Sequence, residues 1–386
     1  MTVRPRGRDG RRGAAARRAV AVLALLAASA ACAFLPVPPR AGEGDVPGAD
    51  AAASPSAPAK VVLGYYAYWT RPRFDQAMID FGGLTHLAHA FAWPDAAGNL
   101  VLPPRFLYPE LLASARAAGV TTLLSLGGWG NCAAFPAMAA GAESRRRFVG
   151  QVVGFCAANG YDGVDLDWEF PADATDRENL TLLVRELAAA LRARTPPLLL
   201  TMAAPARGFH GRWIDFERLA GDLDYVGFMT YGYHGAWSGH SGPNAPLYAA
   251  GGDACGSVDE TFAYALARGL PPGKVLLGLP FFGKSFDCGG WGLPFRTSAN
   301  LTYADIMALP AAEWETGWDD AARAPFLRRV DGAAVISYDD PRSIALKCRY
   351  AVDKGAGGVM VWELGGDRRA GSSELLAAVG RALAAR

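Results

Sequence analysis

The sequence of 386 residues is poor in the side chains that build metal centres and covalent cross-links. It has six cysteines and five histidines, and no Cys-x-x-Cys pair or cysteine–histidine spacing typical of a zinc site occurs in it. We therefore expect no metal ion and no cofactor. Five cysteines lie beyond residue 33, so at least one of them cannot pair within that part of the chain. Among the disulfides that could form, Cys255–Cys288 is favoured, because these residues flank the next-to-last expected strand.

The sequence also has little net charge and no apolar segment long enough to make a comfortable membrane span. The formal charge is +1 and the isoelectric point is about 7.6, and the absence of a basic stripe argues against nucleic-acid binding. Residues 19–33 are apolar but fall short of the roughly 20 residues that a membrane helix needs. Seven arginines precede this run and small residues end it, which is typical of a secretory signal peptide.

The N-terminal 59 residues are therefore interpreted as export and tether segments. Residues 1–33 would be the signal peptide and residues 34–59, rich in Ala, Pro, Gly and Ser, a disordered linker. Two alternatives stay open, a retained membrane anchor and a lipoprotein attached through Cys32. We expect a secreted, monomeric protein whose folded domain comprises residues 60–386.

From residue 60 onward, short β-rich runs alternate with amphipathic helical patterns. The expected strands are 61–69, 84–91, 121–126, 163–170, 198–204, 225–231, 275–282 and 358–363. Helical spacing is clearest at residues 142–157 and 177–194. Eight such units predict an α/β fold of the (β/α)8 TIM-barrel type. The long connection between the seventh and eighth strands leaves about residues 284–338 as a small α+β insertion.

The fourth expected strand carries carboxylates on alternate positions of an otherwise apolar sequence, YDGVDLDWEFP. Asp165, Asp167 and Glu169 share one face, which in a barrel is the interior. Close carboxylates cannot all ionise, so at least one pKa must rise, which supplies a general acid near neutral pH. The alternative, a strand edge that simply faces water, suits an antiparallel sheet better than a parallel one.

This stretch resembles the DxxDxDxE signature of glycoside hydrolase family 18, the chitinases and their relatives. Four further segments resemble motifs of the same family: SLGGWG (125–130), FMTYGYHGAW (228–237), GLPFFG (278–283) and VMVWEL (359–364). The resemblance implies a secreted chitinase that cleaves β-1,4-linked N-acetylglucosamine polymers by a retaining, substrate-assisted mechanism through an oxazolinium ion, an exception to the two-carboxylate scheme. An endo-β-N-acetylglucosaminidase of the same family and a non-catalytic chitin-binding protein are the alternatives.

The resemblance also implies roles for the polar residues of the site. Glu169 would protonate the glycosidic oxygen and then activate water, and Asp167 would orient the acetamido group of the sugar. Asp165 would share a proton with Asp167, and Tyr231 would hydrogen-bond the acetamido oxygen. Asp162 has the other parity, and we expect it to bond backbone near the start of the strand.

The expected substrate is chitin or chito-oligosaccharides, which aromatic and apolar side chains would contact at the strand ends. The expected substrate-binding residues are Tyr66, Trp129, Met229, Trp237 and Trp362. One position departs from the family pattern: the sixth-strand motif usually reads MTYD, and Gly232 stands here in place of that aspartate.

Overall fold

A computed structural model describes residues 60–206, 208–251, 253–369 and 371–384. The predicted signal peptide and linker lie outside the described residues. No helix within the described ranges has the length and apolar character needed to cross a membrane.

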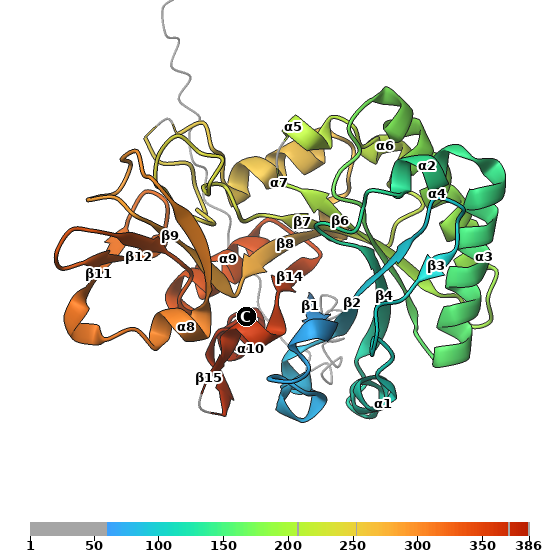
Figure 1. Ribbon diagram of the computed structural model, residues 1–386, viewed down its shortest axis with the longest axis horizontal. Helices are drawn as coiled ribbons and strands as arrows, with labels where there is room; N and C mark the ends of the chain where they lie inside the picture. Colours follow the sequence, from blue (N-terminus) through green and yellow to red (C-terminus); the bar gives the residue numbers. More distant parts are fainter. Residues whose placement is uncertain (1–59, 207, 252, 370, 385–386) are drawn as a thin grey trace, which may run out of the picture. The chain divides into compact units, whose positions relative to one another are not determined.

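Eight parallel strands form a closed barrel (Figure 1). In chain order they are β1 (Val61–Ala67), β2 (His86–Pro94), β4 (Thr121–Gly127), β5 (Gly163–Asp167), β6 (Leu199–Pro205), β7 (Tyr225–Met229), β8 (Val275–Pro280) and β14 (Gly358–Trp362). Strand β1 pairs with both β14 and β2, which closes the barrel. The short strand β3 (Leu100–Val101) pairs antiparallel with the end of β2. The predicted (β/α)8 architecture is confirmed, and each of the eight expected strands is present.

The helices that follow the barrel strands have local signals for where they begin. They are α1 (Pro109–Ala117), α2 (Phe135–Ala140), α3 (Ala142–Asn159), α4 (Ala174–Arg192), α5 (Gly208–Gly211), α6 (Phe216–Leu219), α7 (Val258–Ala267), α9 (Pro341–Asp353) and α10 (Glu374–Ala384). In α4, the Asp173 side chain caps the first turn by accepting a hydrogen bond from the Asp176 amide. In α9, Asp340 and Ser343 form a reciprocal capping box around Pro341, an arrangement that satisfies backbone donors at a helix start.

Side-chain parity divides the barrel into an interior and an outer layer. On β1, Val61, Leu63 and Tyr65 belong to the interior cluster, whereas Val62 and Tyr66 belong to the larger core between strands and helices. This alternation is the period of two of a β-strand. It decides which residues of each strand can reach the site at the mouth of the barrel.

An antiparallel sheet of five strands lies between β8 and α9, at the left in Figure 1. Its members are β9 (Phe282–Phe286), β10 (Ser298–Thr302), β11 (Trp314–Asp319), β12 (Ala324–Arg329) and β13 (Val335–Ser337), with helix α8 (Tyr303–Met307). Two-residue strands β15 (Arg368–Arg369) and β16 (Ser372–Ser373) form a separate hairpin before α10. The prediction of a Cys255–Cys288 disulfide is wrong. Cys288 is a reduced thiol that donates a hydrogen bond to the Gly290 carbonyl at 3.2 Å.

A buried ion pair joins the end of the insertion to helix α9. Lys347 and Asp339 are both almost completely buried, and the lysine ammonium donates to Asp339 Oδ1. The Ser343 hydroxyl donates to the same oxygen at 2.6 Å. Burial raises the pKa of Asp339, and the charge of Lys347 and these hydrogen bonds act in the opposite direction.

Removing one partner of this pair leaves an uncompensated buried charge. We expect Asp339→Asn to lower the free energy of unfolding by about 3–5 kcal/mol, measured by urea denaturation. Glu143→Gln is the matched control, since it breaks the exposed pair of Glu143 with Arg147 and should cost less than about 1 kcal/mol. Equal losses in the two variants would contradict a special role for the buried pair.

Candidate active site

Three acidic side chains, Asp165, Asp167 and Glu169, follow one another along β5 and just past its end, and we call them the acid line. Asp165 and Asp167 are 1% and 4% exposed, and Glu169 comes two residues after the strand. Trp168 lies on the opposite side, where it stacks on Phe135 of α2 with ring centroids 5.2 Å apart. The predicted division between inward acids and outward apolar residues is present in the structure.

Asp165 is held by hydroxyl groups from β1 and from the two strands that flank β5, β4 and β6. Tyr65 and Ser125 donate to its Oδ2 at 2.8 and 2.7 Å, and Thr201 donates to its Oδ1 at 2.7 Å. Burial raises the pKa of Asp165, and the three hydrogen bonds oppose that rise. These hydroxyls favour the ionised form, so Asp165 is the member of the line best equipped to hold negative charge.

Asp167 and Glu169 have much less help from hydrogen bonds. Burial raises the pKa of Asp167 well above its ordinary value, and the charges of Glu169 and Asp165 raise it further. Its Oδ1 atom has no hydrogen-bond partner among the described residues. Burial raises the pKa of Glu169 to about 7, against a backbone hydrogen bond from Trp129. The raised pKa values favour the protonated forms of Asp167 and Glu169, and Glu169 at the outer end of the acid line can act as an acid near neutral pH.

The turn after β4 approaches β5 closely enough to require glycine. Gly127 has a φ of +114°, and a Cβ atom there would lie 2.1 Å from the Asp167 carbonyl oxygen. The Gly128 amide donates to the same oxygen at 2.8 Å. Cys132, which follows this turn, accepts a hydrogen bond from the Glu169 amide at 3.2 Å. The glycine pair thus fixes the backbone that carries both acids.

Tyr231, Met229 and Trp362 lie against the interior cluster at the carboxyl ends of β7 and β14. Burial raises the pKa of Tyr231, and the charges of Asp167 and Glu169 raise it further. Trp362 stacks on Phe91 with centroids 5.6 Å apart and meets the Tyr65 ring edge-on at 5.5 Å. All three residues can therefore face a molecule at the barrel mouth.

Trp129 and Trp237 are strongly exposed, which is unusual for tryptophan. Their side chains are 78% and 67% exposed. The ammonium of Lys284 lies 4.6 Å from the Trp237 ring centroid, a cation–π contact. Flat exposed rings can stack on the C–H faces of sugars, and neither ring is used for core packing.

A hollow of about 700 Å³ lies beside the end of β1. Trp69 and Arg71 are among the residues that line it, and Trp69 contacts Trp362 at a centroid distance of 6.3 Å. None of the three acids lines this hollow. The hollow is therefore not the catalytic centre, whose position is given by the acid line.

Tyr66 was expected to line the pocket, and that prediction is wrong. The side chain is 0% exposed and packs in the outer core, where its hydroxyl donates to the Phe74 carbonyl at 2.8 Å. The inward residue is its neighbour Tyr65. The sequence reasoning also missed Ser125 and Thr201 as partners of Asp165. Ser125 lies within the quoted SLGGWG motif, whereas nothing in the sequence singled out Thr201.

Asp162 is placed as expected, at the start of the strand and outside the acid line. Its Oδ2 accepts hydrogen bonds from the Thr122 amide and hydroxyl at 2.8 and 2.9 Å. These contacts tie the beginning of β5 to β4. The role of Asp162 is therefore structural.

The side chain of Asn244 connects the end of β7 to the insertion. Its Oδ1 accepts from the Gly232 amide at 3.1 Å, and its Nδ2 donates to the Phe282 carbonyl at 3.2 Å. Its backbone amide donates to the Ser337 hydroxyl at 2.6 Å. One asparagine thus links the backbone next to Tyr231 with β9 and β13.

The residues matched by a family model decide the classification of the chain. The model for glycosyl hydrolases family 18 matches residues 61–367, which include the acid line, the glycine turn and the barrel strands. The chain belongs to this family. It is accordingly a glycoside hydrolase.

Individual family members agree with this assignment. Chitinase 1 of Aphanocladium album is 32% identical over 299 residues, which cover 74% of this chain and 70% of that protein. The structure of Ostrinia furnacalis Group IV chitinase in complex with allosamidin has a TM-score of 0.78 at 27% identity, covering 84% of this chain and 99% of that one. A family 18 N-acetylglucosaminidase from Paenibacillus barengoltzii has a TM-score of 0.76 at 28% identity and covers 84% and 99%.

Gly232 stands where the family 18 motif usually has aspartate, and its backbone is left-handed, with a φ of +69°. A Cβ atom there would lie 3.5 Å from the Trp237 ring, which is ordinary van der Waals contact. Space therefore permits a side chain, and the cost lies in the backbone. Aspartate adopts this conformation more readily than alanine does.

The raised pKa of Glu169 predicts how activity depends on pH. A general acid at this position would have to be protonated to work, so kcat/KM should be high below about pH 7 and fall as pH rises through that value. Gly232→Asp adds a carboxylate, which should raise the pKa of Glu169 further and move the falling limb to higher pH. Gly232→Ala is the control for backbone strain and should leave the limb in place. Superimposable pH profiles for all three proteins would rule out the proposed electrostatic effect.

The two adjacent tyrosines on β1 predict opposite consequences for the same substitution. Tyr65→Phe removes a hydrogen bond to a charged carboxylate, worth about 1.5–3 kcal/mol, so kcat on a fluorogenic glycoside should fall about 10- to 100-fold. Tyr66→Phe removes only the bond to Phe74 and should lower the free energy of unfolding by about 1 kcal/mol with kcat unchanged. A larger kcat loss in Tyr66→Phe than in Tyr65→Phe would refute this assignment.

Proposed function

We propose that the protein is a secreted chitinase that hydrolyses β-1,4-linked N-acetylglucosamine polymers with retention of configuration. The observation that carries the proposal is the acid line at the barrel mouth, where Glu169 has a pKa of about 7. The exposed rings of Trp129 and Trp237 beside that mouth suit a chain of sugars. The relatives named as chitinases support the same substrate class.

In the proposed mechanism the protein supplies no nucleophile. Protonated Glu169 donates its proton to the glycosidic oxygen while the acetamido oxygen of the substrate attacks the anomeric carbon, and the leaving sugar departs with that proton. Asp167 and Tyr231 hold the acetamido group for this attack, and such positioning replaces a costly encounter step. The Glu169 carboxylate then takes a proton from a water molecule. The oxygen of that water attacks the anomeric carbon, and the acetamido oxygen leaves that carbon, which opens the oxazolinium ring.

The division of charge among the three acids suits these steps. Asp165, held by three hydroxyls, keeps its negative charge next to Asp167. Asp167 can then carry a proton in the free enzyme and pass it to Asp165 when the substrate binds, and its carboxylate accepts a hydrogen bond from the acetamido N–H as positive charge grows on the substrate. Trp362, stacked on Phe91, gives the reacting sugar a flat floor.

Glu169→Gln tests the proposal directly. We expect hydrolysis of a fluorogenic chitobioside to fall by at least about a hundredfold, the scale of general acid catalysis, with binding to insoluble chitin retained. Glu363→Gln is the matched control, because burial also raises the pKa of Glu363 to about 7 but its carboxylate caps a backbone amide at Gly365. That variant should keep its activity.

The outcome of this assay separates the proposed chitinase from its alternatives. Chitin binding without turnover in the wild-type protein would indicate a non-catalytic chitin-binding protein. Cleavage of the chitobiose core of N-glycans in preference to chito-oligosaccharides would indicate an endo-β-N-acetylglucosaminidase. Turnover of chito-oligosaccharides that disappears in Glu169→Gln supports a chitinase.

The proposal of secretion rests on residues 1–33, with the arginine-rich start and the apolar run that precede the tether. Sequencing the N-terminus of protein recovered from culture medium tests it. A mature N-terminus shortly after residue 33 supports export with cleavage. A lipid-modified Cys32 at the N-terminus of membrane-bound protein would support the lipoprotein alternative.

A further inference from the structure

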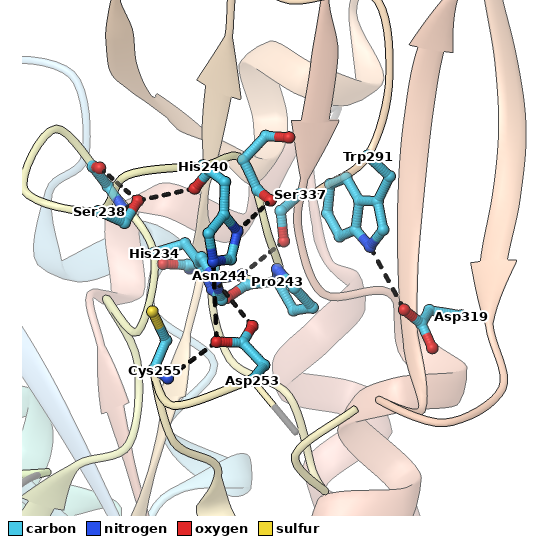
Figure 2. Close-up of polar contacts among 12 residues, drawn as sticks. His234, Ser238, His240, Pro243, Asn244, Asp253, Cys255, Trp291, Asp319 and Ser337 are labelled. Atoms are coloured by element: carbon cyan, nitrogen blue, oxygen red, sulfur yellow. Dashed lines mark hydrogen bonds and ion pairs between the residues drawn. The ribbon is translucent and has the colours of Figure 1, made fainter. Parts of the chain in front are cut away.

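Four side chains with metal-binding atoms gather in the loop between β7 and α7. They are His234, His240, Asp253 and Cys255, and each offers one ligand atom (Figure 2). These four atoms all lie within 4.8 Å of one another. None of the four residues has a role in the proposed mechanism.

The hydrogen bonds of the two histidines fix which ring nitrogen is bare. His234 Nδ1 lies 3.0 Å from the Pro243 carbonyl oxygen, and His240 Nδ1 lies 3.1 Å from the Ser241 carbonyl oxygen. A carbonyl oxygen can only accept, so Nδ1 carries the hydrogen in both rings. In a neutral ring the lone pair is then on Nε2, the arrangement found in metal-ligating histidines whose other nitrogen bonds a backbone carbonyl.

Both bare nitrogens lie beside a carboxylate. His234 Nε2 is 2.9 Å from Asp253 Oδ2, and His240 Nε2 is 4.0 Å from Asp253 Oδ1. The His234 ring is fully buried, and its Nε2 makes no contact of hydrogen-bond geometry with the described residues despite that short distance. A lone pair and a carboxylate repel at this separation, so the arrangement is stable only with a proton on His234 Nε2 or with a metal cation bound by both groups.

We propose that His234, His240, Asp253 and Cys255 bind a zinc ion. Tetrahedral zinc with bonds of about 2.0–2.3 Å holds its ligand atoms about 3.3–3.6 Å apart. The four ligand atoms here all lie within 4.8 Å of one another, which is close enough for them to share one ion. As the Zn–S bond forms, the Cys255 thiol releases its proton to solvent. The thiolate and the carboxylate together neutralise the two charges of the ion, and the two imidazoles complete the four-coordinate shell.

The donor set selects the metal. Thiolate and imidazole are the ligands that zinc prefers, whereas Mg²⁺ and Ca²⁺ require oxygen-rich sites. Because the protein supplies all four ligands, the site is of the closed, structural kind. Zinc here would therefore hold the loop together and take no part in the cleavage reaction.

The position of the cluster indicates which part of the protein a bound zinc ion would stabilise. Trp237 lies between the two histidines in sequence, and the Ser241 amide donates to the Leu293 carbonyl of the insertion at 2.8 Å. The Ser241 hydroxyl donates to the Gly290 carbonyl at 3.0 Å. A zinc ion would thus fix the segment that presents Trp237 and its connection to the insertion.

Zinc loading of the full chain tests the proposal. The protein, freed of any histidine tag, is treated with EDTA, incubated with ZnCl2 and desalted, and its metal content is measured by mass spectrometry. We expect one zinc per chain for the wild type. His240→Ala and Cys255→Ser each remove a partly exposed ligand and should weaken zinc binding by about 100-fold or more, since even outer contacts to ligands are worth about 10–100-fold.

Matched substitutions elsewhere control for general effects. His210→Ala removes an exposed histidine and Cys288→Ser a thiol outside the cluster, and both variants should keep one zinc. Zinc should also raise the melting temperature of the wild type but not of His240→Ala or Cys255→Ser. Circular dichroism before loading shows whether each variant is folded.

Cobalt supplies a spectroscopic signature of the same site. Co²⁺ bound to the wild type should give a near-ultraviolet thiolate-to-metal band that disappears in Cys255→Ser and persists in Cys288→Ser. Wild-type protein that takes up no zinc would overturn the proposal and leave a protonated His234 paired with Asp253. Equal zinc uptake by wild type, His240→Ala and Cys255→Ser would overturn it as well.

Discussion

The burial of carboxylates inside a barrel is the constraint on which the site depends. A carboxylate transferred from water to a protein interior loses its hydration, and it stays ionised only where other groups replace that water. The chain provides replacement hydroxyls at Asp165 and almost none at Asp167, whose Oδ1 has no partner in the described structure. Asp165 and Asp167, two positions apart on one strand, therefore differ in how strongly other strands stabilise their ionised forms.

Backbone packing supports this electrostatic arrangement. The Gly127–Gly128 turn reaches the Asp167 carbonyl, and the Cys132 thiol meets the Glu169 amide. These contacts hold the end of β5 from the β4 side, while Asp162 ties its beginning to Thr122. The acids are thus carried by backbone that is fixed at both ends of β5.

The barrel and the acid line were predictable because they follow periodic patterns. Strands alternate with helices along the whole chain, and β5 alternates acids with apolar residues. Tyr65 and Tyr66 were not distinguishable in that way, since both faces of β1 are apolar and either tyrosine could point inward. Nor could the sequence bring together His234, His240, Asp253 and Cys255, because these residues are irregularly spaced within one loop and only the folded loop makes them neighbours.

Asn244 couples the insertion to the backbone of the active site. Its side chain contacts the backbone beside Tyr231 and strand β9, and its backbone amide contacts β13, so one residue fixes the end of β7 and two strands of the insertion. A substitution at Asn244 would therefore loosen the insertion and the backbone beside Tyr231 together, while the acids on β5 keep their own contacts with β4.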